Sequence, residues 1–263
     1  MKKLFIVIPA HNEEYRIEKT LKDYSSFFEN LRKKKIVDYE LFIVINATTD
    51  NTEGIIKRFK KKNIRINYVV YKEGGKGFAI IQGFRTALNK KNDFIGFVDA
   101  DDSTKAEDFY KLFANIKNYD GAIASRWLKD SKITVRQRLV RRIFSRGFNF
   151  LVRAFFLMPY RDTQCGAKLF KREVIEKVID TLAITKWAFD VDLLYKVRKK
   201  KFCIKEVPVS WEDDPKTKIN LKRVPLQMFL GIVRLRILNS PFSFLIKAYD
   251  RLPEKIKLHH KII

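Results

Sequence analysis

The chain has few cysteines and no long hydrophobic run, and these two absences exclude several classes of protein. Its 263 residues contain two cysteines, Cys165 and Cys203. Two cysteines cannot build a disulfide framework, and their spacing is not that of a metal site. No stretch approaches the roughly 18 apolar residues that a membrane-spanning helix needs. We therefore expect a reducing, cytoplasmic compartment, with any membrane contact made at the membrane surface.

Acidic residues are scarce relative to basic ones. The 55 lysines and arginines outnumber 30 aspartates and glutamates, for a net charge of +25. Such an excess fits nucleic-acid binding, an anionic membrane surface with anionic substrates, or a lysine-rich proteome. No zinc finger, RNP-like aromatic motif or DNA-reading helix is recognisable, so nucleic acid is not an expected partner.

Up to about residue 125 the sequence alternates between strand and helix patterns. The apolar start of the chain resembles the beginning of a signal peptide, but it turns polar at His11 and is interpreted as the first strand. Near-continuous apolar strands that alternate with helices predict an α/β fold with a single, mainly parallel central sheet flanked by helices. The expected strands are Leu4–Pro9, Glu40–Asn46, Ile64–Tyr71, Phe94–Asp99 and Gly121–Ser125, and the expected helices are Ile17–Phe28, Ile55–Phe59, Phe78–Leu88 and Phe109–Ile116.

Two later segments, Ile133–Tyr160 and Val224–Leu252, mix arginines with aromatic and aliphatic residues. Basic amphipathic helices of this kind suit a membrane interface. Each segment on its own is also compatible with an ordinary amphipathic helix packed on the sheet. Two such segments in so basic a chain favour contact with an anionic membrane surface.

The most informative motif is the end of the fourth expected strand, where an apolar run meets Asp99, Asp101 and Asp102. Crowded carboxylates repel one another and stay ionised easily only beside a cation. Two acids at positions i and i+2 can share a hard divalent ion, with phosphate oxygens and water completing its shell. The alternative is an exposed acidic turn that caps the next helix.

Three other strand ends carry small or polar residues: Pro9–Glu14, Asn46–Thr52 and Glu73–Gly77. The glycines of the third allow close backbone approach, and Lys76 can meet a phosphate at a helix N-terminus. The spacing of a Walker loop is absent. Because parallel strands end at one edge of a sheet, the four segments predict one nucleotide-diphosphate site there.

The order of these motifs carries a family resemblance from about Leu4 to Lys218. The chain resembles the dolichyl- and polyprenyl-phosphate sugar transferases, which belong to the inverting family 2 of nucleotide-sugar glycosyltransferases and have the GT-A fold. The D-T-Q-C-G segment leans towards the dolichyl-phosphate β-glucosyltransferase branch. The matching segments read IPAHNEE, NATTDNT, GGKG, DADD, ASRW, DTQCGAKLF, WAFDVDLL and VPVSW.

The resemblance implies a domain organisation and an activity. Residues 1–222 would form the GT-A domain, with a nucleotide-binding half at 1–125 and an acceptor half at 126–222, and residues 223–263 would be an amphipathic, membrane-associated segment. The enzyme would transfer a hexose with inversion to a dolichyl or polyprenyl phosphate, most plausibly glucose from UDP-glucose. It would be peripheral, at the cytoplasmic face of the membrane.

The resemblance also implies roles on the donor side. Relatives usually carry a D-D-G-S-type loop where this chain has Asn46, whose amide can still hydrogen-bond a uracil edge. Lys76 would lie near the donor, and Asp99 and Asp101 would hold Mg²⁺ or Mn²⁺ against the diphosphate. The base and ribose pocket would be lined by Pro9, Ala10, Asn12 and Glu14.

On the acceptor side, a lipid monophosphate is already anionic and needs positioning more than deprotonation, which suits a cluster of arginines. Asp101, Arg126 and Asp190 are the expected catalytic residues. Asp190 is the candidate if a general base is used, and a sugar-hydroxyl ligand or a structural salt bridge is its alternative role. Asp192, where relatives more often have Glu, would face the sugar with Asp190. The expected acceptor-binding residues are Ser125, Arg126, Arg136, Arg138, Asp162, Gln164, Lys168 and Asp192.

Other functions stay open at this point. Within the class, GDP-mannose is the alternative donor and a hydroxyl group the alternative acceptor. From another class, the chain could be a non-catalytic scaffold that binds membranes or nucleic acid. Metal-dependent nucleotide binding separates the enzyme from the scaffold.

Overall fold

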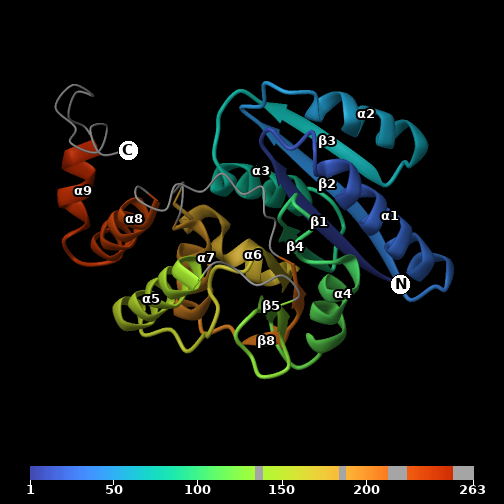
Figure 1. Ribbon diagram of the computed structural model, residues 1–263. Coiled ribbons are helices and arrows are strands. Elements are labelled where there is room, and N and C mark those ends of the chain that lie inside the picture. Colours follow the sequence, from blue (N-terminus) through green and yellow to red (C-terminus); the bar gives the residue numbers. More distant parts are fainter. Residues whose placement is uncertain (134–138, 184–187, 213–223, 251–263) are drawn as a thin grey trace.

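The computed structural model describes residues 1–133, 139–183, 188–212 and 224–250. A central twisted sheet runs through the fold, with helices on both of its faces (Figure 1). The strands are β1 (Lys2–Ala10), β2 (Val37–Asn46), β3 (Ile66–Tyr71), β4 (Phe94–Val98), β5 (Gly121–Ser125), β6 (Lys132–Ile133), β7 (Ala167–Lys171), β8 (Ile204–Pro208) and β9 (Ser210–Trp211). The helices are α1 (Ile17–Lys33), α2 (Thr52–Lys62), α3 (Lys76–Leu88), α4 (Ala106–Asn115), α5 (Leu139–Phe156), α6 (Arg172–Val178), a 3₁₀ turn η1 (Ile179–Thr181), α7 (Phe189–Lys199), α8 (Val224–Leu238) and α9 (Ser243–Asp250).

The main sheet has seven strands in the order β3-β2-β1-β4-β7-β5-β8. The first four are parallel to one another, and β8 is parallel to β5. Only β7 is antiparallel to its neighbours among the described strands of this sheet. Because β7 runs the other way, its first residue, and not its last, lies at the edge where β4 ends. The mainly parallel α/β sheet expected from the sequence is confirmed.

The five strands and four helices expected before residue 125 are all present. Strand β5 has the expected bounds. Helices α1, α2 and α3 extend beyond their expected bounds, α1 by five residues at its C-terminus, and α4 starts three residues earlier and ends one residue earlier than expected. The added turn of α1 carries Arg32 and Lys33, and basic side chains at a helix C-terminus complement its dipole. The apolar periodicity identified the buried face of α1. It underestimated the length of the helix because the last turn is partly exposed to solvent and mostly polar.

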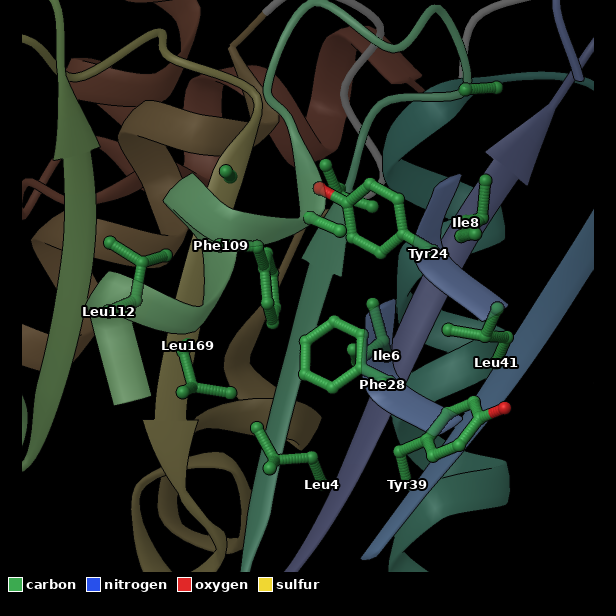
Figure 2. Packing of buried hydrophobic residues seen from close by; sticks show 14 of the residues in the cluster. Leu4, Ile6, Ile8, Tyr24, Phe28, Tyr39, Leu41, Phe109, Leu112 and Leu169 are labelled. Atoms are coloured by element: carbon green, nitrogen blue, oxygen red, sulfur yellow. The ribbon is translucent and has the colours of Figure 1, made fainter. Parts of the chain in front are cut away.

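Two apolar clusters cover the two faces of the sheet. The cluster on one face joins the sheet to α1, α2 and α4, and Figure 2 shows Tyr24 and Phe28 of α1 and Phe109 of α4 beside Ile6 of β1. The other cluster joins the sheet to α3, α5, α6, α7 and α8. Coverage on both faces explains why the strands are apolar throughout instead of alternating.

The described parts of the two arginine-rich segments form helices α5, α8 and α9. Helix α5 packs on α8, and α8 packs on α9 (Figure 1). Val152 and Phe156 of α5 and Ile232 and Leu235 of α8 are buried, so both helices contribute to the core. Helix α5 is amphipathic, whereas α8 is apolar around most of its circumference and lacks the amphipathic pattern expected of it. Within the described ranges, no helix is both long enough and apolar enough to cross a membrane.

Candidate active site

The loops after β1, β2, β3 and β4 meet at one edge of the sheet, as the sequence predicts. Each holds one residue in the left-handed region of backbone conformation, namely Asn12 (φ 54°), Ala47 (φ 44°), Gly75 (φ 122°) and Asp102 (φ 59°). Three of these four are not glycine, and such conformations cost energy that the surrounding structure must supply. Their concentration at four consecutive strand ends marks this edge as the functional edge.

The first two loops bind each other. The Asn12 side-chain oxygen accepts from the N–H of Thr49 at 2.8 Å, and the Glu14 carboxylate accepts from the N–H of Asn51 at 3.1 Å. In return, the N–H of Glu14 donates to the Asp50 carboxylate at 3.1 Å. Asn12 and Glu14, both expected to line the nucleotide pocket, therefore fix one loop on the other.

Asn46 differs from the role expected for it. Its side chain is 2% exposed, its amide nitrogen donates to the Ala10 carbonyl at 3.0 Å, and its amide oxygen accepts from the Gly75 N–H at 3.0 Å. Both ends of the amide are thus engaged within the protein. Asn46 therefore ties the ends of β1 and β2 to the loop after β3, whereas its amide was expected from the sequence to bind a base. Pro9 and Ala10 are buried and line the edge through their backbone.

A chain of alternating charges runs from the interior to the end of β4. The Lys168 ammonium, fully buried, donates to the Cys165 carbonyl at 2.7 Å and to Asp190 at 2.5 Å. Asp190 also pairs with Lys76 at 3.4 Å, and Lys76 reaches Asp99 at 2.8 Å. Burial alone would raise the pKa of Asp190, but Lys168 and Lys76 together hold it below its ordinary value. The contacts favour the salt-bridge role of Asp190 over the general-base role.

Asp99 and Asp101 form the accessible acidic pair of this edge. Removal from water raises the pKa of Asp99, Lys76 opposes this shift, and the nearby Asp101 carboxylate adds to it. Asp102, the third acid of the motif, turns inward, where its carboxylate pairs with Lys105 at 2.5 Å and Lys19 at 3.2 Å. Two carboxylates are therefore left to face a ligand.

These two carboxylates fit a divalent ion of the hard class. Oxygen donors are the ligands that Mg²⁺ and Mn²⁺ prefer, and the mutual repulsion of the pair would fall when a cation binds. Within the described ranges, no three histidine, cysteine or acidic side chains gather around one point. Asp99 and Asp101 would thus hold the ion together with phosphate oxygens and water, as the sequence predicts.

The D-T-Q-C-G segment reaches Asp99 because β7 is antiparallel. Gly166 immediately precedes β7, and its carbonyl accepts from the N–H of Asp99 at 3.0 Å. A Cβ on Gly166 would lie 1.8 Å from Asp99 Oδ2. Glycine is therefore required for the carboxylate to occupy its position. From the sequence, the D-T-Q-C-G segment indicated a family branch, and the contact of Gly166 with Asp99 was not predicted.

Arg126 is held by Asp162 and by aromatic rings. The Arg126 guanidinium donates to the Asp162 carboxylate at 2.7 and 3.0 Å, and the Arg126 backbone N–H donates to the same carboxylate at 3.0 Å. The ring centroids of Trp127 and Trp211 lie 5.6 and 5.2 Å from the guanidinium carbon. Burial would raise the pKa of Asp162, but Arg126 lowers it below its ordinary value. The pair stays ionised, and Asp162 orients Arg126 instead of facing an acceptor.

The remaining residues expected to bind the acceptor are Ser125, Gln164, Asp192, Arg136 and Arg138. Ser125 Oγ and Gln164 Nε2 lie beside the Arg126–Asp162 pair in sequence and are buried polar atoms with no hydrogen-bond partner among the described residues. Asp192 is fully buried; its Oδ2 accepts from the N–H of Ala183 at 2.7 Å, and its Oδ1 has no hydrogen-bond partner among the described residues. Arg136 and Arg138 lie outside the described residues.

Two further residues belong to the site and escaped sequence reasoning. Burial raises the pKa of Glu13 to about 7 despite Arg16, and Asp101 and Asp99 add to the shift, so Glu13 is part of the same electrostatic field. Asn149 of α5 is buried, and its oxygen accepts from the N–H and hydroxyl of Thr163 at 3.3 and 3.1 Å. In the sequence, Asn149 stands between Phe148 and Phe150, and a single amide in an aromatic stretch was the one signal that could have pointed to a structural role.

Comparison with known proteins decides the family. The family model described as "Glycosyl transferase family 2" matches residues 5–179, two thirds of the chain. The chain belongs to glycosyl transferase family 2. The match to family 2 includes all four strand-end loops and the D-T-Q-C-G segment. The enzyme class predicted from the sequence, a glycosyltransferase, is thereby confirmed.

Similar curated relatives include several dolichyl-phosphate β-glucosyltransferases. Those of Dictyostelium discoideum and Saccharomyces cerevisiae are each 31% identical to this chain and are aligned over 89% of it and over 73% and 74% of their own lengths. The human enzyme is 31% identical, over 91% of this chain and 77% of its own. The resemblance found in the sequence is confirmed.

The solved structures support the fold. Glucosyl-3-phosphoglycerate synthase from Mycobacterium tuberculosis, in complex with UDP, has a TM-score of 0.63 at 17% identity, covering 90% of this chain and 79% of that one. The complex of that synthase with Mn²⁺, UDP and phosphoglyceric acid has a TM-score of 0.64 at 16% identity, covering 90% and 78%. The GT-A architecture expected from the sequence is confirmed.

Proposed function

We propose that this family 2 enzyme transfers glucose from UDP-glucose to dolichyl phosphate or a related polyprenyl phosphate, with inversion, at a membrane surface. The observation that carries the proposal is the contact of Lys76 with Asp99 beside Asp101, which joins a phosphate-binding lysine to a metal-binding acidic pair at one sheet edge. The dolichyl-phosphate β-glucosyltransferase relatives support the sugar and the acceptor. A Mn²⁺ and UDP-glucose complex of the M. tuberculosis synthase supports the donor and a divalent ion.

In this proposal residues 1–125 bind the donor nucleotide and residues 126–222 bind the acceptor. The interlocked loops around Asn12 and Glu14 receive the base and ribose, and the N-terminus of α3 with Lys76 receives the diphosphate. When bound, a divalent ion at Asp99 and Asp101 supplies positive charge to the leaving diphosphate.

The acceptor half needs to position an anion. A lipid monophosphate carries its own nucleophilic oxygen, so no side chain has to remove a proton before attack. Arg126, kept charged and rigid by Asp162, gives one fixed cation, and the buried polar atoms of Ser125 and Gln164 offer hydrogen bonds nearby. The absence of a requirement for a base agrees with Asp190 being committed to two lysines.

The test is a transfer assay with a short polyprenyl phosphate, comparing UDP-glucose with GDP-mannose in the presence of Mn²⁺ or Mg²⁺. We expect turnover with UDP-glucose, abolished by EDTA and restored by added metal. Turnover with GDP-mannose alone would replace the donor assignment. Activity that is unaffected by EDTA would contradict the assignment of Asp99 and Asp101 to a metal.

Contact with the membrane is proposed for the surface formed by α5, α8 and α9. Large apolar side chains on or beside these packed helices are exposed, and α5 and α8 also carry arginines. With a net charge of +25, an anionic lipid surface is the occupant that the charge favours. The proposed side is the cytoplasmic face. The exposed apolar residues are Phe150, Leu157, Phe229, Phe242 and Phe244.

Vesicle binding tests this surface. The double replacement Phe242→Ser and Phe244→Ser should weaken binding to phosphatidylcholine–phosphatidylserine vesicles at least about tenfold, because the apolar surface of two phenylalanines is no longer buried in the membrane. The matched control is Ile64→Ser, since Ile64 is 87% exposed beside β3, away from these helices. Equal binding by all three proteins in a co-sedimentation assay would exclude this surface.

A further inference from the structure

Lys76 lies between two carboxylates that differ in their exposure to solvent. Its ammonium is 2.8 Å from Asp99 Oδ1 and 3.4 Å from Asp190 Oδ2. The side chain of Asp190 is 6% exposed, and its other oxygen is fixed by buried Lys168 at 2.5 Å. The side chain of Asp99 is 37% exposed and stands at the end of β4. Lys76 therefore has one buried partner, Asp190, and one closer, partly exposed partner, Asp99, that a ligand can reach.

The two oxygens of the Asp99 carboxylate have different surroundings. Oδ2 packs against Gly166, where a Cβ would be only 1.8 Å away, and Oδ1 carries the Lys76 ammonium. A divalent ion that binds this carboxylate meets the lysine charge at close range. Two positive charges a few ångströms apart repel strongly in a partly buried site, so Lys76 and the ion cannot both keep their best positions.

We propose that Lys76 and the divalent ion compete for Asp99, and that the donor diphosphate ends the competition by accepting the Lys76 ammonium while the ion takes the carboxylate. The inference rests on the proposed function, because it needs a nucleoside diphosphate as donor. Lys76 is the first residue of α3, at the helix end that attracts phosphate, and Asp190 keeps hold of it during the shift.

The competition couples metal binding to nucleotide binding. Without nucleotide, the ion must displace Lys76 from Asp99, and Asp190 is then, among the described residues, the one acidic side chain left to pair with Lys76. With nucleotide, the same lysine gains the diphosphate, and the ion gains both Asp99 and phosphate oxygens. Each ligand therefore raises the affinity for the other, and by linkage the two factors are equal. The site would assemble only when the donor is present.

Binding of Mn²⁺ alone to nucleotide-free protein, followed by electron paramagnetic resonance of the free ion, tests this coupling. Lys76→Met is expected to tighten Mn²⁺ binding about tenfold and to reduce the enhancement by UDP by a similar factor. Lys76→Arg keeps a competing charge and should bind Mn²⁺ as weakly as the unchanged protein. The matched control is Lys57→Met, which removes an exposed lysine paired with Glu53 on α2 and should change nothing.

Unchanged or weaker Mn²⁺ binding by Lys76→Met would overturn the proposal, and so would tighter binding by Lys76→Arg. Circular dichroism shows whether each variant is folded, and Lys76→Gln carries the same expectation if the methionine variant is not. The measurement contains no sugar and no acceptor. A protein that fails to transfer glucose but shows the Lys76 effect would contradict only the proposed function, and the reverse result only the competition.

Discussion

Replacing Gly166 with alanine is expected to lower kcat for sugar transfer about 100-fold with the fold retained. The new methyl group would stand 1.8 Å from Asp99 Oδ2, so the carboxylate must move. Displacing a reacting or metal-binding group by about 1 Å typically costs this much. The measurement is kcat at saturating donor and metal, with thermal unfolding measured in parallel.

The control for this change is Gly147→Ala on α5. A Cβ at Gly147 would have no atom within 4 Å, and alanine is favoured over glycine in a helix, so both activity and stability should be kept. Full activity of Gly166→Ala would mean that Asp99 is not held where the metal assignment requires it.

Asp190→Asn is expected to destabilise the folded protein by about 3–5 kcal/mol, because it leaves the charge of fully buried Lys168 without its counter-ion. Urea unfolding gives the free energy directly. The control is Asp180→Asn, which makes the same change at an exposed position in η1 and should be neutral.

A double replacement separates stability from function at this position. Lys168→Met with Asp190→Leu removes both buried charges, and such an exchange is often neutral or stabilising. We expect it to recover most of the lost stability but not the transfer activity, since Lys76 still lacks its anchor. Recovery of activity would show that Asp190 serves only the packing of the core.

The donor edge could be predicted from sequence because it depends on local signals. Apolar strands that end abruptly in polar residues give both the strand and its direction, and parallel strands bring their ends together. Asp99, Asp101 and Lys76 follow from this rule alone. The sheet partner of β4 could not be found in the same way, because nothing local to Ala167–Lys171 says that it inserts antiparallel between β4 and β5.

The roles of individual polar residues were harder to predict than their location. Asn46 and Asp192 were expected to face ligands. In the structure both side chains form hydrogen bonds with backbone groups of the protein. Residue type and position identify a polar side chain near a site, whereas its orientation depends on which backbone donors and acceptors the tertiary fold leaves to be satisfied. Gly166 and Asn149 illustrate the same limit, since their contacts join segments distant in the sequence.

The most direct test of the proposed transfer follows the product of the assay with UDP-glucose, a polyprenyl phosphate and Mn²⁺ by nuclear magnetic resonance. Attack opposite the leaving diphosphate predicts glucose joined to the lipid phosphate in the β configuration, formed only with metal present. An α-linked product, glucose released into water, or no turnover with either UDP-glucose or GDP-mannose would contradict an inverting transferase that uses a lipid phosphate acceptor.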